Sequence, residues 1–456
     1  MEEIEHVEVT KRLDRLKVRG VYVWDLYRYP LQNIVIDRCK NSYPNKTPIK
    51  LHLKAILFFF LALFRHSPFS KKIIFLRHPR LARINQNAFK EIYSDYIISD
   101  VSKSERCLIF DPPSLVYDTN NKITLETIPT TLIYVVSELC FQLMKPFLFD
   151  RFTRSKTVNC FLNNIVNFLP EGYAKYDFYH DIFARIYKFK LHYMIWRTIF
   201  FVYRPKLLIL TVSSGNEALV YAARKSGAKV FELQHGSPVA GKLNYDYKSG
   251  ISKTYVPDIF LSFGGFMHEQ LPKLPHEKII PVGFAHFNHL RNQTRNNRSN
   301  CRNKRILILS QAKTDYVLQK WLIANSNKFR KYEVEIRLHP YYNTVDDLPF
   351  KNVPYRLTKA SDYPLYTYMN TFDLVCGMFS TAMYEARALG LGVCIVPSEY
   401  NGLMSQFVER GYGIPCPDIM EPDFLEELFK GNGTQEIFMP YAPKNLLSAM
   451  ELKSEV

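Results

Sequence analysis

Residues 206–233 read KLLILTVSSGNEALVYAARKSGAKVFEL, and this segment decides the fold. Its beginning, Lys206–Val212, is a continuous apolar run, which predicts a strand buried on both faces of a parallel sheet. Asn216–Ser226 has helical spacing and ends at Gly227, a residue that favours the end of a helix. Lys229–Leu233 predicts the next strand, and two strands joined through a helix by short turns indicate a doubly wound α/β sheet.

The same alternation extends outward on both sides of this segment. Strands are predicted earlier at Lys72–Leu76 and Leu108–Phe110, and Thr124–Tyr203 has a mostly helical pattern. Two more strands are predicted later at Asp258–Ser262 and Lys278–Val282. This series is long enough for one complete α/β domain.

A second series of strands and helices follows a basic segment. Arg291–Arg305 contains six basic residues and no acidic one, which predicts a solvated interdomain linker or, alternatively, an anion-binding patch. The later strands are predicted at Arg305–Leu309, Glu333–Leu338, Asp373–Cys376 and Gly392–Val396, and the helices at Asp315–Asn327 and Thr381–Leu389. We therefore expect an α/β protein with two Rossmann-like domains that face each other across a cleft. The expected parts are a helical appendage at 1–68, a first domain at 69–290, the linker at 291–305 and a second domain at 306–456.

Composition limits the classes of partner. The chain has 456 residues with 47% hydrophobic and 23% charged, which excludes a disordered or collagenous protein. Its eight cysteines show no CxxC pair and no histidine at ligand spacing, so neither a zinc ribbon nor a disulfide scaffold is indicated, and a reducing compartment suits them. The formal charge of +17 suggests an anionic membrane surface or nucleic acid. Nucleic acid is not favoured, because the basic linker has no aromatic side chain to stack on a base.

The N-terminal region contains the most apolar run of the chain. The first residues, MEEIEHVEV, do not form a signal peptide. Ala55–Phe64 would rise only about 15 Å as a helix, against roughly 30 Å of bilayer core, so it cannot span a membrane. It is expected to be either a buried core helix or a helix lying on an anionic membrane surface. The mixed aromatic and basic segment Trp24–Arg38 is expected to be an interface-seeking helix.

One candidate site follows the strand that ends at Leu233. The segment Gln234-His235-Gly236-Ser237 places a histidine where a strand of the first domain ends, and a histidine with a near-neutral pKa suits a general base. A histidine satisfied within a turn is the alternative. The carboxylates of Glu232 and Asp246 are the other candidates for the base. The residues expected on the acceptor side are Gln234, Gly236, Ser237, Ser213 and Ser214.

A second candidate site lies in the second domain. Arg337-Leu338-His339-Pro340 ends one strand, and Gly377-Met378-Phe379-Ser380-Thr381 joins the next strand to a helix. A helix N-terminus presents free N–H groups and a positive dipole, which suits a phosphate. Glu385 lies about one turn further along and could bind a ribose hydroxyl. The alternatives are a turn histidine at 339, a simple helix cap at Ser380 and a surface glutamate that pairs with Arg387.

These motifs resemble those of the GT-B glycosyltransferases over roughly Lys71 to Pro415. The pair RLHP and GMFST is similar to motifs of bacterial sialyltransferases and polysialyltransferases, and with QHG it also resembles bacterial Kdo transferases and CDP-glycerol glycerophosphotransferases. The resemblance implies that His339, Ser380 and Thr381 bind the donor phosphate, that Glu385 lies near the ribose, and that His235 faces the acceptor. The acidic base motif common in sialyltransferases is absent from the first domain, and no Asp-x-Asp motif occurs, which agrees with a metal-free site.

The resemblance implies a bacterial enzyme that builds cell-surface polysaccharide, such as capsule or the O-antigen of lipopolysaccharide. We expect a nucleotide-sugar donor, with a CMP-sugar favoured, a lipid-linked glycan acceptor and no cofactor. The expected location is cytoplasmic, at the inner face of the inner membrane. Three rivals remain: a polyol-phosphate transferase, a UDP-sugar 2-epimerase and a non-catalytic, membrane-docked protein of transferase fold.

Overall fold

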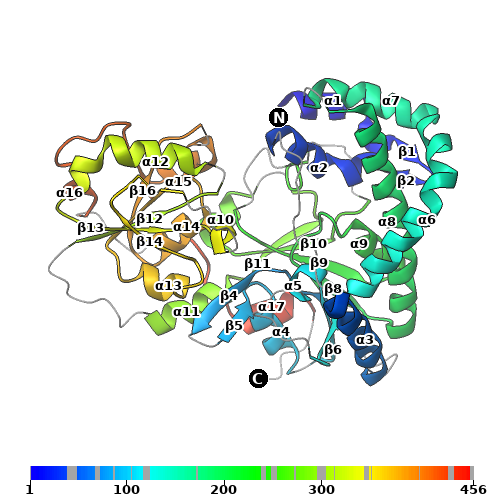
Figure 1. The fold of residues 1–456 in the computed structure, drawn as a ribbon. Helices are drawn as coiled ribbons and strands as arrows, with labels where there is room; N and C mark the ends of the chain where they lie inside the picture. The colour runs from blue at the N-terminus through cyan, green and yellow to red at the C-terminus, as the bar shows by residue number, and fades with distance from the viewer. Residues whose placement is uncertain are drawn as a thin grey trace.

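The chain folds into two α/β units, each built on its own parallel sheet (Figure 1). The computed structural model describes residues 2–37, 49–66, 72–85, 88–103, 105–116, 124–170, 173–237, 243–247, 254–271, 274–294, 304–312, 314–343, 349–350, 352–399, 401–429 and 436–451. Most of the expected basic linker, residues 295–303, lies outside the described residues. The α/β class with two Rossmann-like domains is confirmed by the strand order of both sheets.

The first sheet has seven parallel strands in the order β11-β10-β9-β8-β3-β6-β7. The strands are β3 (Ile73–Leu76), β6 (Cys107–Asp111), β7 (Thr127–Pro129), β8 (Leu207–Leu210), β9 (Lys229–Leu233), β10 (Ile259–Ser262) and β11 (Lys278–Pro281). The chain adds strands on one side of β3 and then on the other, so the strand order reverses beside β3. Ligands of open α/β sheets bind at such a reversal, beyond the carboxyl ends of the strands. The ends of β3, β8 and β9 therefore face the expected site.

Both faces of this sheet are covered by helices, because its strands are apolar on both sides. One face packs on α3 (Ile49–Arg65), α6 (Thr131–Thr153), α8 (Lys175–Tyr203) and α9 (Glu217–Lys225). The other packs on α4 (Asp95–Val101), α11 (Ala285–Thr294) and α17 (Pro443–Ala449). The strand residues alternate between these two cores, as the period of two requires.

The N-terminal residues join a helical layer rather than forming a separate interface helix. α1 (Glu2–Thr10) and α2 (Val23–Asp37) pack with α7 (Lys156–Ile165), α6 and α8 around a shared aromatic core. The expected interface-seeking helix Trp24–Arg38 is wrong for the described part of that segment, because Trp24 and Tyr27 are fully buried. Arg28 is also buried and pairs with Glu8 at 2.7 Å. The turn between β1 (Lys17–Val18) and β2 (Val21–Tyr22) closes this layer.

The second sheet has six parallel strands in the order β14-β13-β12-β15-β16-β17. They are β12 (Arg305–Leu309), β13 (Glu333–Arg337), β14 (Arg356–Thr358), β15 (Leu374–Gly377), β16 (Gly392–Ile395) and β17 (Ile414–Pro415). Its helices are α12 (Asp315–Ala324), α13 (Leu365–Met369), α14 (Thr381–Ala388), α15 (Ser405–Glu409) and α16 (Phe424–Leu428). An unexpected disulfide joins Cys394 of β16 to Cys416 just beyond β17, since the register of these strands brings their Cα atoms to 6.1 Å.

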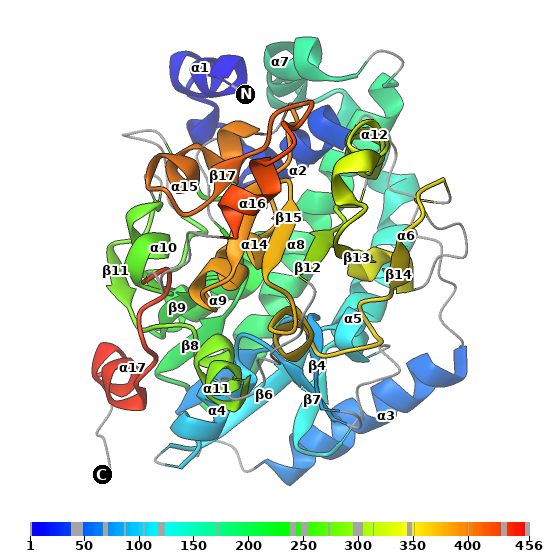
Figure 2. The same cartoon turned by 90° about the vertical axis from the view of Figure 1, so that its left-hand side faces the viewer.

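One apolar core joins the two domains. It contains Phe263, α10 (Gly265–Glu269) and α11 from the first domain together with α13, α14 and α15 from the second. The chain then returns: Met439 N–H donates to Phe263 O at 2.9 Å, and α17 packs on the first sheet beside α4 (Figures 1 and 2). The expected C-terminal bound of the second domain, residue 456, is therefore wrong, because the last helix, α17, packs on the first domain. Gly283 permits the return, since a Cβ atom there would lie 2.6 Å from Tyr441 N.

Three shorter elements complete the first domain. The antiparallel hairpin of β4 (Leu81–Asn85) and β5 (Ala88–Glu91) follows β3 directly. The short helix α5 (Pro113–Val116) follows β6. The hairpin packs its Ala82 and Ile84 side chains against the core that joins the domains. The segment that follows β3 therefore lies at the domain junction.

Candidate active site

The two sequence motifs meet at the domain junction. The turn after β9 holds Gly236 with a φ of +61°, and a Cβ atom at Gly236 would lie 3.4 Å from Thr381 Oγ1. Thr381 is the first residue of α14 in the second domain. Contact between motifs about 145 residues apart is what a two-domain transfer site requires, because donor and acceptor must be held together.

His235 is oriented by a buried polar network. The Tyr245 hydroxyl lies 2.9 Å from His235 Nδ1 and donates to Glu232 Oε1 at 3.0 Å. Glu232 also accepts from Ser213 N–H at 3.1 Å and lies 3.1 Å from His276 Nε2. Burial raises the pKa of Tyr245 well above its usual value, so the phenol keeps its proton. This network fixes the ring of His235 from one side.

The network also assigns the tautomer of His235. Tyr245 gives its single hydroxyl proton to Glu232 Oε1. The Tyr245 oxygen can then only accept from His235, which assigns a proton to Nδ1. In the uncharged form of this tautomer, Nε2 is the ring atom that can take a proton as a general base. Glu232 is completely buried and touches the site through Tyr245, so its position suits a positioning residue rather than the base.

His339 has the opposite tautomer. Its Nδ1 accepts from Tyr341 N–H at 3.2 Å, so the neutral ring carries its proton on Nε2. Its own N–H donates to Ser310 Oγ at 3.1 Å, which anchors the turn to the end of β12. Burial, followed by the charge of Arg80, lowers the pKa of His339. At neutral pH His339 is therefore an uncharged hydrogen-bond donor, suited to an anionic oxygen.

A second His-Pro turn occupies the end of β3, and the sequence analysis assigned it no role. His78 Nδ1 accepts from Arg80 N–H at 3.2 Å, the same local geometry as at His339. The ring of His78 lies 5.9 Å from that of His235, and burial with the charge of Arg80 lowers the pKa of His78 to about 4. The sequence does contain a pattern that indicates His78: a His-Pro pair follows an apolar run both at 78–79 and at 339–340.

Arg80 is the cation of the junction. Its guanidinium donates to Tyr93 Oη at 3.0 Å, and its charge acts on His339 and on Glu385. It is exposed to solvent even though protein atoms surround it closely. An exposed cation within a crowded junction is suited to an anionic ligand.

The segment expected to hold a phosphate forms the N-terminus of α14. Ser380 caps α14, since its hydroxyl accepts from Ala382 N–H at 3.3 Å. Gly377 lets α14 approach β15, because a Cβ atom there would lie 2.9 Å from Met383 Sδ. Pro340 ends the His339 turn and is exposed. The N-terminus of α14 therefore opens beside Gly236 with Ser380 and Thr381 half-buried.

Two residues expected to bind the donor are placed elsewhere. Arg337 is buried and donates to the carbonyls of Ala360 and Tyr363 at 2.9 and 2.8 Å, so it anchors the loop after β14. Glu385 is 4% exposed and faces the interior of the junction, where burial raises its pKa and Arg80 lowers it. Sequence spacing could not show this, because the side of α14 that packs inward depends on the opposite domain.

The acceptor-side residues divide into two groups. Gln234 is buried and shapes the turn, accepting from Phe263 N–H at 2.7 Å and donating to Gly236 O at 3.1 Å. Ser237 lies 3.5 Å from Gln270. Ser213 and Ser214 line a separate small pocket at the end of β8. The other residues that line it are Asp25, Arg28, Tyr29, Glu217, Leu243, Asn244, Tyr247, Tyr255 and Val256.

This pocket holds buried oxygen atoms without a partner. Both carboxylate oxygens of Asp25 and the amide oxygen of Asn244 are buried and make no hydrogen bond within the described structure. Burial raises the pKa of Asp25 well above its usual value, and burial raises that of Glu217. Buried oxygens of this kind suit donors such as sugar hydroxyls. Asp246, the other candidate base, uses its backbone oxygen to accept from Arg28 at 2.5 Å.

Within the described residues, no group of three or more histidine, cysteine or acidic side chains is placed to hold a metal ion. The polar groups that meet at the junction include Arg80, the imidazoles of His78, His235 and His339, and the N-terminus of α14. Such groups can stabilise negative charge and accept a proton.

Three kinds of comparison with known proteins were made. No family model matches the sequence, and no curated protein matches it. Among solved structures, the chain is similar to the spinosyn rhamnosyltransferase SpnG complexed with thymidine diphosphate, with 13% identity, a TM-score of 0.46, and coverage of 83% of this chain and 100% of that one. It is also similar to the UDP-GlcNAc 2-epimerase of Methanocaldococcus jannaschii, with 12% identity, a TM-score of 0.47 and coverage of 83% and 99%. The glycosyltransferase SnogD of Streptomyces nogalater gives 13% identity, a TM-score of 0.45 and coverage of 84% and 99%. At these values the likeness carries no argument about activity, and the two-domain Rossmann-like fold rests on the observed strand order.

Proposed function

We propose that the protein is a glycosyltransferase that moves a sugar from a nucleotide-activated donor to a glycan acceptor. The observation that carries the proposal is the meeting of histidines held in two opposite ways at one junction. His235 is held through Nδ1–H by Tyr245, whereas His78 and His339 accept a hydrogen bond at Nδ1 and so offer Nε2–H as a hydrogen-bond donor. A transfer from a nucleotide-sugar needs both, because a hydroxyl loses a proton while a phosphate gains charge.

The donor is assigned to the second domain. His339 Nε2–H, Ser380, Thr381 and the N–H groups that open α14 stabilise the leaving phosphate, and Arg80 adds its charge from the first domain. Losing one such donor typically costs about 3 kcal/mol in the transition state. A CMP-sugar is the favoured donor on the motif resemblance, and the site is proposed to work without a metal ion or cofactor.

The acceptor is assigned to the first domain. His235 Nε2 takes the proton of the acceptor hydroxyl, and the pocket of Ser213, Ser214 and Asp25 binds further sugar hydroxyls. The proposed acceptor is a lipid-linked glycan of a bacterial capsule or O-antigen, and the proposed location is the cytoplasmic face of the inner membrane. A polyol-phosphate transferase would use the same groups and is the second candidate.

The first test is a thermal-melt panel of the full chain with CMP, CDP, UDP, GDP and TDP. A nucleotide at 100 times its dissociation constant adds about 2.7 kcal/mol to the free energy of unfolding, which a melt resolves. We expect one cytidine nucleotide to stabilise the protein, and His339→Ala to weaken that effect. If no nucleotide shifts the melt, the protein is a non-catalytic member of the fold and the proposal is wrong.

The second test separates the reactions. Each activated sugar that stabilises the protein is incubated with and without an acceptor glycan, and the products are identified by mass. Transfer requires the acceptor, whereas a 2-epimerase would convert a UDP-sugar alone. Transfer of a phosphorylated polyol would instead assign the second candidate.

A further inference from the structure

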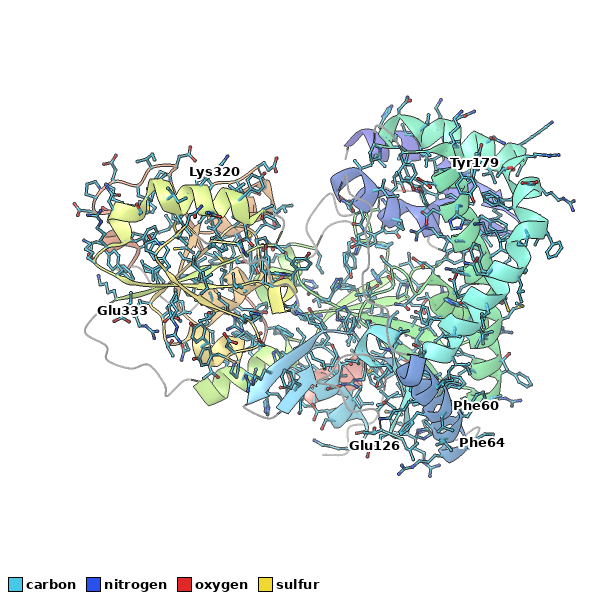
Figure 3. All side chains as sticks on the ribbon, in the orientation of Figure 1. Phe60, Phe64, Glu126, Tyr179, Lys320 and Glu333 are labelled. Carbon is cyan, nitrogen blue, oxygen red and sulfur yellow. A yellow bond between two sulfur atoms is a disulfide. The ribbon has the colours of Figure 1, made fainter. Side chains whose placement is uncertain are left out.

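Two neighbouring helices of the first domain expose apolar stripes. α3 and α6 pack against each other and against the first sheet through Phe59, Ala62 and Ile133. Their outer sides are apolar as well, and the exposed residues are Leu53, Leu57, Phe60, Leu61 and Phe64 on α3 and Tyr134, Val136, Leu139, Leu143 and Phe147 on α6. Phe64 is 85% exposed and Phe147 is 82% exposed, and Figure 3 shows Phe60 and Phe64 projecting outward from α3. An exposed apolar surface of this extent marks a binding face.

The stripe on α6 could serve either to cross a membrane or to lie on one. α6 is long and apolar enough to cross a membrane by length and composition. It packs along α8 and also contacts α3 and α7, so it lies against the domain rather than apart from it. Of the two acids on α6, Glu138 pairs with Lys188 at 2.6 Å, and Asp150 is exposed directly before Arg151. These contacts favour a helix that lies in the plane of an interface.

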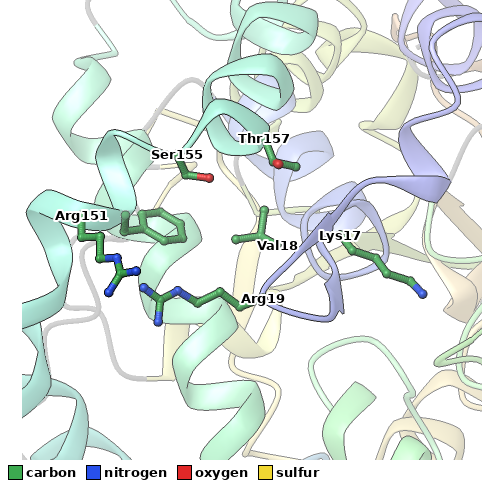
Figure 4. A pocket seen from close by; sticks show the side chains of 7 residues that line it. Lys17, Val18, Arg19, Arg151, Ser155 and Thr157 are labelled. Carbon is green, nitrogen blue, oxygen red and sulfur yellow. The ribbon is translucent and has the colours of Figure 1, made fainter.

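The α6 stripe leads into a basic pocket. Leu139, Leu143 and Phe147 repeat every four residues, and the next position in that series is Arg151. Arg151 lines a cavity of about 470 Å³, whose other lining residues are Lys17, Val18, Arg19, Phe152, Ser155 and Thr157. Figure 4 shows Arg151 and Arg19 extending toward one another from α6 and from the β1–β2 turn. No acidic residue lines the pocket.

The positive charge of this pocket is not neutralised by the surrounding protein. Neither Arg19 nor Arg151 pairs with a carboxylate among the residues that the structure describes, and Arg19 lies over the Tyr187 ring at 5.6 Å. Burial and the charge of Arg19 lower the pKa of the neighbouring Lys190. Guanidinium groups bind phosphate oxygens in pairs of hydrogen bonds, so two of them around one cavity suit a phosphate.

Two local features support a ligand here. Arg19 has a φ of +52° before Gly20 at +83°, in a two-residue hairpin turn that normally takes Asn-Gly. An arginine is thus held where its backbone conformation is unfavourable. Ser155 precedes α7 without capping it by its side chain, so its hydroxyl and the first N–H groups of α7 lie beside the same cavity.

We propose that this face rests on an anionic lipid bilayer, with the α3 and α6 stripes at the acyl–headgroup boundary and with Arg19 and Arg151 binding one lipid phosphate. Charge complementarity identifies the occupant, because apolar stripes that end in an unpaired arginine pocket match acyl chains below anionic headgroups. This surface differs from the one expected from the N-terminal residues, since α2 is buried and α6 supplies half of the face. The proposal shares only the peripheral location with the proposed function, so vesicle binding and sugar transfer can each fail alone.

The test is flotation of the full chain with vesicles of phosphatidylcholine alone and with 30% phosphatidylglycerol added. Arg19→Asn removes a charge and gives the turn its preferred Asn-Gly sequence, and Arg151→Gln keeps a polar side chain of similar length. The double variant should lose at least tenfold in binding to the anionic vesicles, and Leu143→Glu with Phe147→Glu should lose binding altogether. Matched controls on the second domain are Lys320→Gln, at an exposed position labelled in Figure 3, and Ile419→Glu, at a residue 63% exposed, and both should bind as the unchanged protein does.

Four results would overturn the proposal. Equal binding to both kinds of vesicle would remove the role of anionic lipid. Binding that 0.5 M NaCl leaves unchanged would indicate an inserted α6. Calorimetric binding of inorganic phosphate by a protein that ignores vesicles would make the pocket a site for a soluble anion. A dimer in solution that Phe147→Glu dissociates would show that a second copy of the chain covers the stripes.

Discussion

The Tyr245 hydroxyl offers the sharpest test of the active site, because it joins His235 to Glu232. Tyr245→Phe removes the bond of 2.9 Å to His235 and the bond of 3.0 Å to Glu232 without changing the shape of the ring. The lost bond to a carboxylate is worth about 1.5 to 3 kcal/mol in the free energy of unfolding. The imidazole also loses the partner that keeps its proton on Nδ1. Removal of a group that orients a reactive side chain typically lowers activity 10- to 100-fold, which is about 1.4 to 2.7 kcal/mol.

The assay compares transfer and donor binding in the same preparations. With the donor that the melt panel identifies, kcat should fall 10- to 100-fold, while the Kd for the nucleotide should stay within about twofold, because the donor lies mainly on the other domain. Tyr203→Phe is the control, since it removes a buried hydroxyl that bonds to Leu63 O at 3.1 Å, away from the residues of the site. It should lose some stability and keep normal transfer.

A different result would refute the tautomer argument. If Tyr245→Phe lowers the melting temperature and leaves kcat unchanged, the network is only structural. If it weakens nucleotide binding as strongly as it lowers kcat, His235 contacts the donor instead of the acceptor.

The remaining predictions concern three further sites. His235→Ala should lower transfer by roughly two to four powers of ten and remove the ascending limb of the kcat/KM profile, whereas near-normal transfer would return the role of base to a carboxylate. His339→Ala should raise the donor Kd with little change in melting temperature, and Ser380→Ala should do the same at a further stability cost of about 1 kcal/mol for the lost helix cap; collapse of either fold would show a structural role. Burial, followed by the charge of Arg80, lowers the pKa of His286 to about 3. Between about pH 6.5 and pH 3 the unfolded chain therefore binds a proton at His286 that the folded protein does not bind. The free energy of unfolding falls as the pH falls through that window. His286→Gln should flatten the dependence of the unfolding free energy on pH in urea melts, and an unchanged slope would contradict the assignment.

The sequence by itself determined the two sheets. Runs such as KLLIL and RILIL are apolar at every position, and only a parallel sheet covered on both faces buries such strands, so β8 and β12 could be located without coordinates. The ends of some strands could also be predicted, because His-Gly and His-Pro turns interrupt the apolar runs. His235 and His339 were found in this way, and the structure places both at the domain junction.

The tertiary structure decided which side chains of these motifs face the site and in which protonation state. Glu385 and Arg337 have suitable spacing in the sequence, but Glu385 is buried beside Tyr366, and Arg337 is bonded to the loop after β14. The tautomer of His235 depends on Tyr245, ten residues away in a separate turn, and the return of α17 to the first sheet depends on glycines that admit its backbone. The local sequence pattern shows only whether a segment has the period of a strand or of a helix. The features above depend on contacts between segments that are distant in sequence, and such contacts form only when the chain is packed.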